Sequence, residues 1–299
     1  MSDANVPISE AVCALCEGAL DRELLRITQP DRFERHLGIA PVGYARTWVE
    51  CSSCGAVTNV HGAGNRERLD SLSAGYYEVD FATATIGDKF AKVMALPPER
   101  SDNAQRVARI HAFLDAWRPA PSAGRRVLDI GAGTGVFLWR FLEQGESWGW
   151  SGTAVEPDAI AAGHLRSLDR FPVIEGLYSS DLGLAGFDLV TLNKVVEHLP
   201  NPIDLVKQAA SALRSPAGVL YVEVPDKLTV SHRAPEDNIL GALHCHLYDP
   251  VSLAVLLSRA GLATLRIDRV FDPSGKLTMT AFATLDGAIE RMAATGIPE

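Results

Sequence analysis

The 299-residue sequence contains 28 Lys and Arg against 37 Asp and Glu, which gives a formal net charge of −9. This acidic balance argues against a general nucleic-acid-binding surface, because such surfaces need clustered basic side chains. No apolar run approaches the roughly 20 residues that span a membrane. The N-terminal residues have neither the basic start nor the apolar core of a secretory signal. We therefore expect a cytoplasmic protein without membrane insertion, whose thiols stay reduced.

Four of the five cysteines form two C-x-x-C pairs near the N-terminus: Cys13, Cys16, Cys51 and Cys54. Two thiolates on one tight turn can face the same ion, and two such turns supply the four sulfurs that zinc prefers. Gly18 and Gly55, just after the pairs, suit the sharp turns that this geometry needs. The pattern predicts a structural zinc site, because all four coordination positions would be filled by protein.

Residues 1–65 are predicted to form a zinc-ribbon module around these cysteines. Zinc ribbons often bind nucleic acid, so the local charge matters. The module contains five arginines against eight Asp and Glu, and it has no basic stripe. It is expected to serve as a scaffold or substrate lid, with no nucleic-acid partner.

Residues 66–118 read as a connector and helical lid. The connector is rich in small residues and contains two adjacent tyrosines, Tyr76 and Tyr77. Residues 101–117 then predict an amphipathic helix capped by Asp102. Its apolar positions recur at helical spacing: Val107, Ile110, Phe113, Leu114 and Trp117.

Strands and helices alternate through residues 119–285, ahead of a helical tail at 286–299. The predicted strands cover residues 126–131, 151–157, 171–176, 187–193 and 217–225, and the helices cover 135–145, 158–168, 201–214 and 249–261. Repeated strand–helix units imply a parallel sheet covered on both faces. The last two apolar segments, 263–270 and 277–284, are joined by a short connection and predict a hairpin with one antiparallel strand.

The stretch "VLDIGAGTGVF" places three glycines where a strand turns into a helix: Gly131, Gly133 and Gly135. Glycine permits the tight turn and the close approach of backbone to a ligand. The dinucleotide fingerprint needs its third glycine where Val136 stands, so that match fails. The G-x-G-x-G spacing, with Asp129 two residues ahead, resembles motif I of the class I S-adenosylmethionine-dependent methyltransferases.

This resemblance covers about residues 100–285 and implies a Rossmann-like α/β fold with a seven-stranded sheet and one antiparallel strand. It implies S-adenosylmethionine as cofactor. Glu156 matches the acidic residue that accepts hydrogen bonds from the ribose hydroxyls, and Asn193 ends the strand that flanks the methionine part. Leu177 stands where an acidic residue is common, so an adenine contact there would come from the backbone.

The combination of cysteine module, tyrosine-bearing connector and catalytic domain resembles sugar methyltransferases of deoxysugar and polysaccharide biosynthesis. The resemblance implies a sugar or nucleotide-linked sugar as substrate, methylated on carbon or oxygen, with a histidine-centred base. The candidates for this acceptor site are His198, Glu223, Asp226, His244, His246, and Tyr76 or Tyr77. Several follow carboxyl ends of strands, where open α/β sheets bind ligands.

The pair His244 and His246 flanks Cys245 in "GALHCHLYDPVSL". We expect the two imidazoles to point to different sides of the segment, so the pair would chelate one ion poorly. We expect one imidazole to reach the acceptor and the other to pack beside it. Cys245 is expected to be buried.

Three alternatives remain at this point. One is a zinc-ribbon methyltransferase of ribosomal RNA, which the acidic module and the lack of a basic, aromatic-interleaved patch disfavour. Another is a small-molecule O-methyltransferase of natural-product biosynthesis. The third is a non-enzymatic protein that kept the cofactor loop, which the intact Asp129, glycines and Glu156 disfavour. The oligomeric state is left open.

Overall fold

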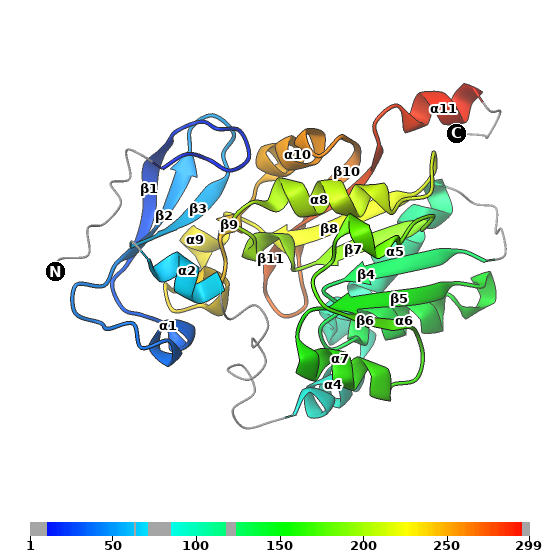
Figure 1. Ribbon diagram of the computed structural model, residues 1–299, viewed down its shortest axis with the longest axis horizontal. Coiled ribbons are helices and arrows are strands. Elements are labelled where there is room, and N and C mark those ends of the chain that lie inside the picture. Colours follow the sequence, from blue (N-terminus) through cyan, green and yellow to red (C-terminus); the bar gives the residue numbers. More distant parts are fainter. Residues whose placement is uncertain (1–10, 63, 71–84, 118–123, 295–299) are drawn as a thin grey trace.

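A seven-stranded sheet forms the centre of the larger part of the computed structural model, which describes residues 11–62, 64–70, 85–117 and 124–294 (Figure 1). The strand order is β10-β11-β8-β7-β4-β5-β6. The strands are β4 (Arg126–Ile130), β5 (Ser151–Glu156), β6 (Val173–Glu175), β7 (Leu189–Asn193), β8 (Val219–Pro225), β10 (Leu262–Phe271) and β11 (Leu277–Leu285). Strands β4 to β8 pair in parallel, and β11 is antiparallel to both neighbours. The predicted α/β fold with one reversed strand is confirmed.

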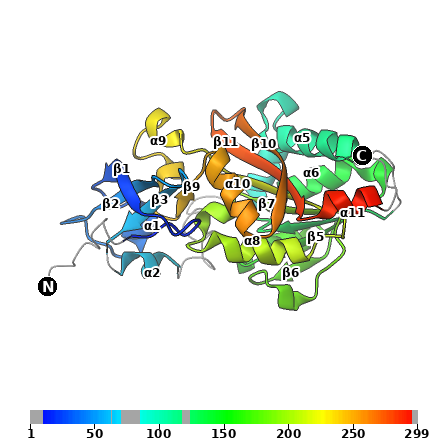
Figure 2. The same cartoon turned by 90° about the horizontal axis from the view of Figure 1, so that it is seen from above.

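Helices cover both faces of this sheet (Figures 1 and 2). One set packs around an apolar cluster on one face: α5 (Asp102–Trp117), α6 (Val136–Gln144) and α7 (Ala159–Ser167), with α4 (Ile86–Met94) against α6 and α7. On the other face lie α8 (Pro202–Ser211) and α10 (Pro250–Arg259). The remaining helices here are α9 (Thr229–His232) and α11 (Ala288–Ala294). Among the described residues, no helix has the length and apolar character needed to cross a membrane.

Short 3-10 turns connect several of these elements. They are η3 (Pro98–Arg100), η4 (Glu146–Trp148), η5 (Ser180–Leu182), η6 (Val196–His198) and η7 (Asn238–Leu240). Of these, η6 follows β7 directly at the carboxyl edge of the sheet. It therefore places its side chains where an open α/β sheet binds ligands.

The helix ends show where local capping was predicted well and where it was not. At α10, Asp249 forms the expected cap and accepts from Ser252 N at 2.8 Å. At α5 the prediction of Asp102 as cap is wrong, because Ser101 Oγ accepts from Ala104 N at 3.2 Å. The Asp102 carboxylate instead accepts from Ser274 N and Oγ, at 2.9 and 2.6 Å. A contact with a residue distant in sequence therefore engages the carboxylate that the local pattern assigned to the helix cap.

The N-terminal module is built on a second sheet, of order β1-β2-β3-β9. Its elements are β1 (Leu20–Ile27), α1 (Arg32–His36), β2 (Arg46–Cys51), β3 (Val57–His61), α2 (Asn65–Asp70) and β9 (His246–Leu247). The two-residue strand β9 comes from the segment after β8 and pairs antiparallel with β3 (Figure 1). The "GALHCHLYDPVSL" segment is therefore shared between the module and the α/β domain.

Side-chain contacts reinforce this connection. Asn59 Nδ2 donates to the carbonyl of His244 at 2.9 Å. Lys227 Nζ lies 2.7 Å from Glu50 Oε1 and 2.5 Å from Asp249 Oδ2, so one cation joins β2 to the start of α10. The buried Trp48 belongs to an apolar cluster that includes Ile239, Leu240 and Leu247. The module thus packs against the loop that carries the predicted acceptor histidines.

Candidate functional site

The glycine loop after β4 has the geometry of a ligand-binding turn. Gly131, Gly133 and Gly135 all have left-handed backbone conformations, with φ of 73°, 55° and 77°. A Cβ at Gly131 would lie 2.6 Å from Val195 Cγ2, and at Gly135 it would lie 2.5 Å from Leu165 Cδ2. These positions therefore require glycine for backbone conformation and for space. The loop leads directly into α6, whose N-terminal N–H groups face the carboxyl edge of the sheet.

Two buried carboxylates flank this loop. Asp129 accepts from Thr191 Oγ1 at 2.6 Å and from Asn193 Nδ2 at 3.0 Å. Glu156, at the end of β5, accepts from Gly133 N at 2.7 Å and from Asp158 N at 2.9 Å. Burial raises the pKa of Asp129 to about 7 and also raises the pKa of Glu156. A cationic ligand would stabilise the charged form of both carboxylates.

The remaining predicted cofactor residues lie at the same edge. Asn193 Oδ1 is buried and has no hydrogen-bond partner in the described chain, so it can accept from a ligand. Leu177 follows β6 and is 72% exposed. The backbone N–H of Gly176, next to it, donates to the carbonyl of Glu156 at 3.0 Å. Leu177 therefore offers an apolar surface close to the Glu156 end of the loop.

His198 and His244 come together although 45 residues lie between them in the sequence. Their ring centroids are 4.5 Å apart in an edge-on arrangement. Glu197, which the sequence analysis did not select, joins them: one ligand atom from each of the three lies within 4.8 Å of the others. The sequence signal for Glu197 was a charged residue inside the apolar run "VVEHLP". Charged residues are rarely buried unless they have a specific partner or role.

Loss of solvent shifts the pKa values of all three groups toward their neutral forms. Burial raises the pKa of Glu197 to about 7, against the opposing effect of Lys194. Burial lowers the pKa of His198 to about 4, and burial together with His198 lowers that of His244 well below its ordinary value. Both imidazoles are therefore neutral at physiological pH, and a neutral imidazole has one nitrogen that donates and one that accepts.

His246 lies in β9, whereas His244 precedes this strand. The two side chains therefore do not follow strand alternation, which would place residues i and i+2 on the same face. Nδ1 of His246 is 3.3 Å from Thr58 Oγ1, and its Nε2 is 3.2 Å from the carbonyl of Pro200. Cys245 between them is buried, and its Sγ donates to the carbonyl of His198 at 3.0 Å. Protein groups thus occupy both nitrogens of His246, whereas His244 faces the cluster.

Glu223 lies in a separate buried network. Arg106 of α5 binds both of its carboxylate oxygens, and Tyr221 Oη donates to Oε2 at 2.7 Å. Lys194 Nζ is 3.6 Å from Oε1 and donates to Thr278 Oγ1 at 3.0 Å. Burial alone would raise the pKa of Glu223, but Arg106 and Lys194 outweigh it and hold the pKa well below its usual range. The carboxylate is therefore ionised and fully occupied.

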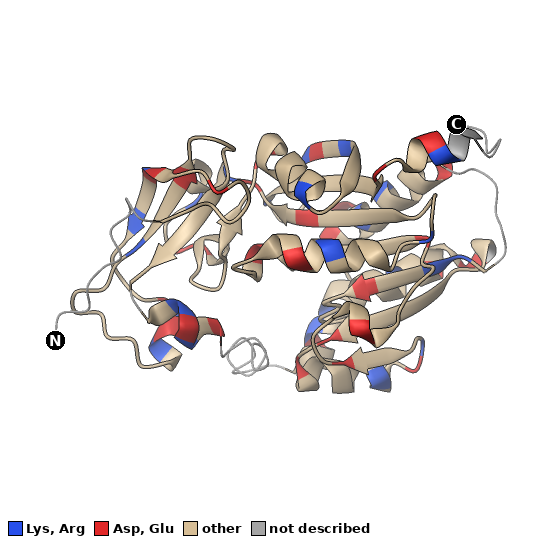
Figure 3. Ribbon diagram, turned by 45° about the horizontal axis from the view of Figure 1, so that its top comes forward, with Lys and Arg blue, Asp and Glu red and all other residues tan. Residues whose placement is uncertain are grey.

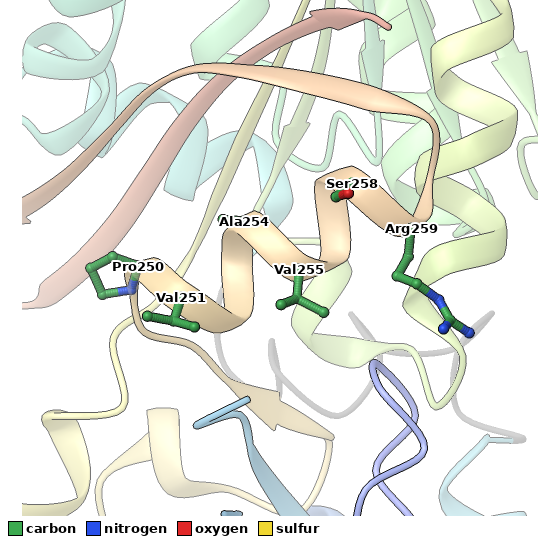
Figure 4. A pocket seen from close by; sticks show the side chains of 6 residues that line it. All are labelled: Pro250, Val251, Ala254, Val255, Ser258 and Arg259. Atoms are coloured by element: carbon green, nitrogen blue, oxygen red, sulfur yellow. The ribbon is translucent and has the colours of Figure 1, made fainter. Parts of the chain in front are cut away.

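Two further candidates complete the predicted set. Asp226 accepts from Leu228 N at 2.9 Å and pairs with Arg269, so it caps the turn after β8. Tyr76 and Tyr77 lie outside the described residues. An open groove elsewhere is lined by six residues of α10 and includes none of the predicted site residues (Figure 4): Pro250, Val251, Ala254, Val255, Ser258 and Arg259.

Comparison with known families now identifies the domain. A family model described as a methyltransferase domain matches residues 100–267, which is more than half of the chain. The chain belongs to this family. The enzyme class expected from the sequence is therefore confirmed at the level of the methyltransferase domain.

Individual relatives of the methyltransferase domain are more distant. The chain is 32% identical over 149 residues to a "Ubiquinone biosynthesis O-methyltransferase" of Xanthomonas axonopodis pv. citri, across 45% of this chain and 58% of that protein. It is 32% identical over 109 residues to a "tRNA U34 carboxymethyltransferase" of Pseudoalteromonas translucida, across 34% of this chain and 33% of that protein. The matches thus span between a third and about three fifths of these relatives.

A solved structure supports the fold. The magnesium protoporphyrin IX methyltransferase of Synechocystis PCC 6803, with bound SAH, is similar with a TM-score of 0.54 and 14% identity. The match covers 73% of this chain and 100% of that chain. At this identity the likeness concerns the fold alone.

The four N-terminal cysteines lie together beside the methyltransferase domain. The Sγ atoms of Cys13 and Cys54 are 3.6 Å apart, those of Cys16 and Cys51 are 3.5 Å apart, and all four lie within 4.8 Å of one another. Four sulfurs around a zinc ion, at about 2.3 Å each, stand about 3.8 Å apart. The donor set therefore fits a tetrahedral zinc ion.

The turns of this cluster support the same interpretation. The residue directly after each pair is left-handed: Glu17, with φ of 64°, and Gly55, with φ of 75°. Gly18 is needed for space instead, because a Cβ there would lie 2.6 Å from Ser53 Oγ. Backbone N–H groups also bond the sulfurs of Cys51 and Cys54. Such bonds stabilise the thiolate form that binds zinc.

We predict that Gly133→Val and Glu156→Ala each abolish or weaken S-adenosylmethionine binding at least tenfold while the protein stays folded. Valine at φ 55° is strained, and alanine at 156 removes a carboxylate that can accept two charge-assisted bonds of about 1.5–3 kcal/mol each. Isothermal titration calorimetry measures the affinity, and circular dichroism checks the fold. Unchanged affinity in both variants would contradict the site.

We predict that cofactor affinity rises with pH between 5.5 and 7. Asp129, with its pKa of about 7, is protonated and neutral below this range, and only the carboxylate form attracts the positively charged cofactor. For one linked proton, the change is up to about tenfold per pH unit. Asp129→Asn should bind weakly and lose this dependence. The same pH profile in wild type and variant would rule Asp129 out as the titrating group.

We predict that the protein contains one zinc ion per chain at the four cysteines and that its removal loosens the module. Hydrogen exchange should accelerate in β2, β3 and β9, because the cysteine turns flank these strands, and stay slow in β4 and β7. Elemental analysis and exchange mass spectrometry provide the measurements. Cys245→Ala, outside the cluster, is the control that should retain zinc. Unchanged exchange protection in metal-free protein would exclude a structural role.

Proposed function

We propose that the protein is an S-adenosylmethionine-dependent methyltransferase that methylates a sugar or nucleotide-linked sugar. The observation that carries the cofactor assignment is the left-handed glycine loop between buried Asp129 and Glu156, at the carboxyl edge of the sheet. The family assignment supports the reaction class. The specific acceptor rests on the cysteine module and the histidine–carboxylate cluster together.

The residues of the loop would hold the cofactor in defined ways. Glu156 offers two oxygens and no donor to a pair of ribose hydroxyls. Asp129 and Asn193 Oδ1 offer acceptors to the ammonium of the methionine part. Bound S-adenosylmethionine supplies an activated methyl group. The protein then has to place the acceptor atom in line with that methyl group and to remove the proton of the acceptor.

Acceptor activation is assigned to Glu197, His198 and His244. One ligand atom from each residue lies within 4.8 Å of the other two, just beyond β7, the strand that ends at Asn193. The histidine-centred base of the sequence analysis is retained in this form, with His244 proposed ahead of His246 because protein groups occupy both His246 nitrogens. Glu223, ionised and bound by Arg106, is proposed as a positioning residue.

A small acceptor is favoured over RNA. In the described residues, Lys and Arg positions are interspersed with Asp and Glu positions on both parts of the molecule (Figure 3). Nucleic-acid binding would need a continuous basic face. The similarity to an O-methyltransferase of ubiquinone biosynthesis makes transfer to the hydroxyl of another small molecule the second candidate. The shorter match to a tRNA-modifying enzyme makes RNA the third.

We predict that His244→Ala lowers turnover by about 10²–10⁴-fold, the range for loss of an acid–base group, with cofactor affinity nearly unchanged. Isotope-labelled cofactor, tested against panels of nucleotide sugars, glycans, phenolic hydroxyl compounds and RNA, identifies the acceptor and measures the rate. His246→Ala should lose less, and His232→Ala, on the exposed α9, should lose nothing. Labelling of RNA alone would refute the sugar assignment.

A further inference from the structure

Glu197 is the most deeply buried residue of the acceptor cluster, and the described part of the chain leaves its carboxylate unpaired. The residue is 1% exposed, and neither carboxylate oxygen has a hydrogen-bond partner in any other described residue. Buried polar atoms in native proteins are almost always paired, and a buried carboxylate without a partner is strongly disfavoured. A ligand that neutralises it is the simplest reason for its presence.

The basic side chains that influence Glu197, Lys194 and Arg106, are already engaged elsewhere. Lys194 Nζ donates to Thr278 Oγ1 at 3.0 Å and lies 3.6 Å from Glu223. Arg106 binds both oxygens of Glu223. The described residues therefore provide Glu197 with long-range attraction from Lys194 but with no ion pair.

The two imidazoles are prepared as neutral nitrogen ligands. His244 Nδ1 lies 2.7 Å from the carbonyl of Ile239, so it donates its proton there and leaves the Nε2 lone pair free. His198 is also hydrogen-bonded to the backbone, at Leu243. Metal-binding histidines typically donate their second nitrogen in this way, which fixes the tautomer and the orientation of the ring.

We infer that Glu197, His198 and His244 form a binding site for a divalent cation at the acceptor side of the methyltransferase domain. Two imidazoles and one carboxylate suit Mn²⁺, Fe²⁺ or Zn²⁺, and three protein ligands leave coordination positions open. Glu197 is buried whereas the two histidines are partly exposed, so the site opens toward the imidazole side. The inference rests on the proposed function only for the role of the ion, not for its binding.

The open coordination positions of the cation favour one class of acceptor. Two neighbouring oxygen atoms would fill these positions best, as in a vicinal diol or an α-hydroxy ketone, and sugars provide both groups. The ion would hold these oxygens and lower the pKa of a coordinated hydroxyl. The imidazoles would then act as ligands, and direct proton removal by them is the outcome expected if no ion binds.

This site is chemically distinct from the cysteine cluster. Four thiolates select zinc, whereas an oxygen-and-imidazole set accepts Mn²⁺. Cys245 does not join the two sites, because its Sγ donates to the carbonyl of His198. The protein with its cysteine site loaded with zinc can therefore be probed with Mn²⁺ separately.

The test uses Mn²⁺ binding to the zinc-loaded protein, followed by electron paramagnetic resonance and by the thermal midpoint. Wild type should bind one Mn²⁺ per chain and melt at a higher temperature with it. Glu197→Gln and His244→Ala should bind at least tenfold more weakly and lose the thermal shift. The metal-free Glu197→Gln protein should be at least as stable as wild type, which separates loss of a ligand from misfolding. His232→Ala is the matched control with wild-type binding.

Two results would overturn the inference: no saturable binding of Mn²⁺, Fe²⁺ or added Zn²⁺, or equal binding by Glu197→Gln and wild type. Cofactor affinity, measured in the same samples, keeps the proposals apart. Tight S-adenosylmethionine binding without a cation would leave the proposed function standing and remove only the ion. Cation binding without cofactor binding would have the opposite effect.

Discussion

The pairing of β9 with β3 is the contact on which the arrangement of the acceptor side depends. Two backbone register pairs, Val57 with Leu247 and Thr58 with His246, attach the segment after β8 to the module sheet. This attachment sets the side to which each histidine points: His246 toward Thr58, and His244 toward His198. The cysteine cluster, at the ends of the same sheet, thereby supports the geometry of a site in the other domain.

The fold of the α/β domain could be predicted from the sequence because its signals are local. Apolar runs of five to eight residues, helical periodicity and the glycine turn each depend on neighbours within one element. The reversed hairpin was also readable from its short connection. The cap of α5 could not be predicted in this way. Ser274, far along the chain, donates to the Asp102 carboxylate that the local pattern assigned to the cap.

The acceptor site could be predicted only in part, because its contacts join distant segments. His198 and His244 were selected by their positions after strands, but their approach depends on a two-residue strand, too short for any periodic signal. Arg106 appeared as one polar position of an amphipathic helix, and its partner Glu223 lies 117 residues away. Glu197 is marked in the sequence as a charged residue within an apolar run, but this local pattern does not indicate which distant residues lie beside it.

The buried carboxylates of the sheet edge fall into two groups that differ in what neutralises them. Glu223 and Asp226 have arginine partners from the chain, Arg106 and Arg269, and therefore need no ligand to neutralise them. Asp129, Glu156 and Glu197 are buried with no such partner among the residues that the structure describes, and burial raises the pKa of each. A protein that retains three such groups along one edge is less stable than one with neutral side chains there. Ligands that bring positive charge, a sulfonium cofactor on the glycine loop and a divalent cation beside His198 and His244, would recover that stability in the bound state. The distribution of unpaired charge thus marks both halves of the reaction site.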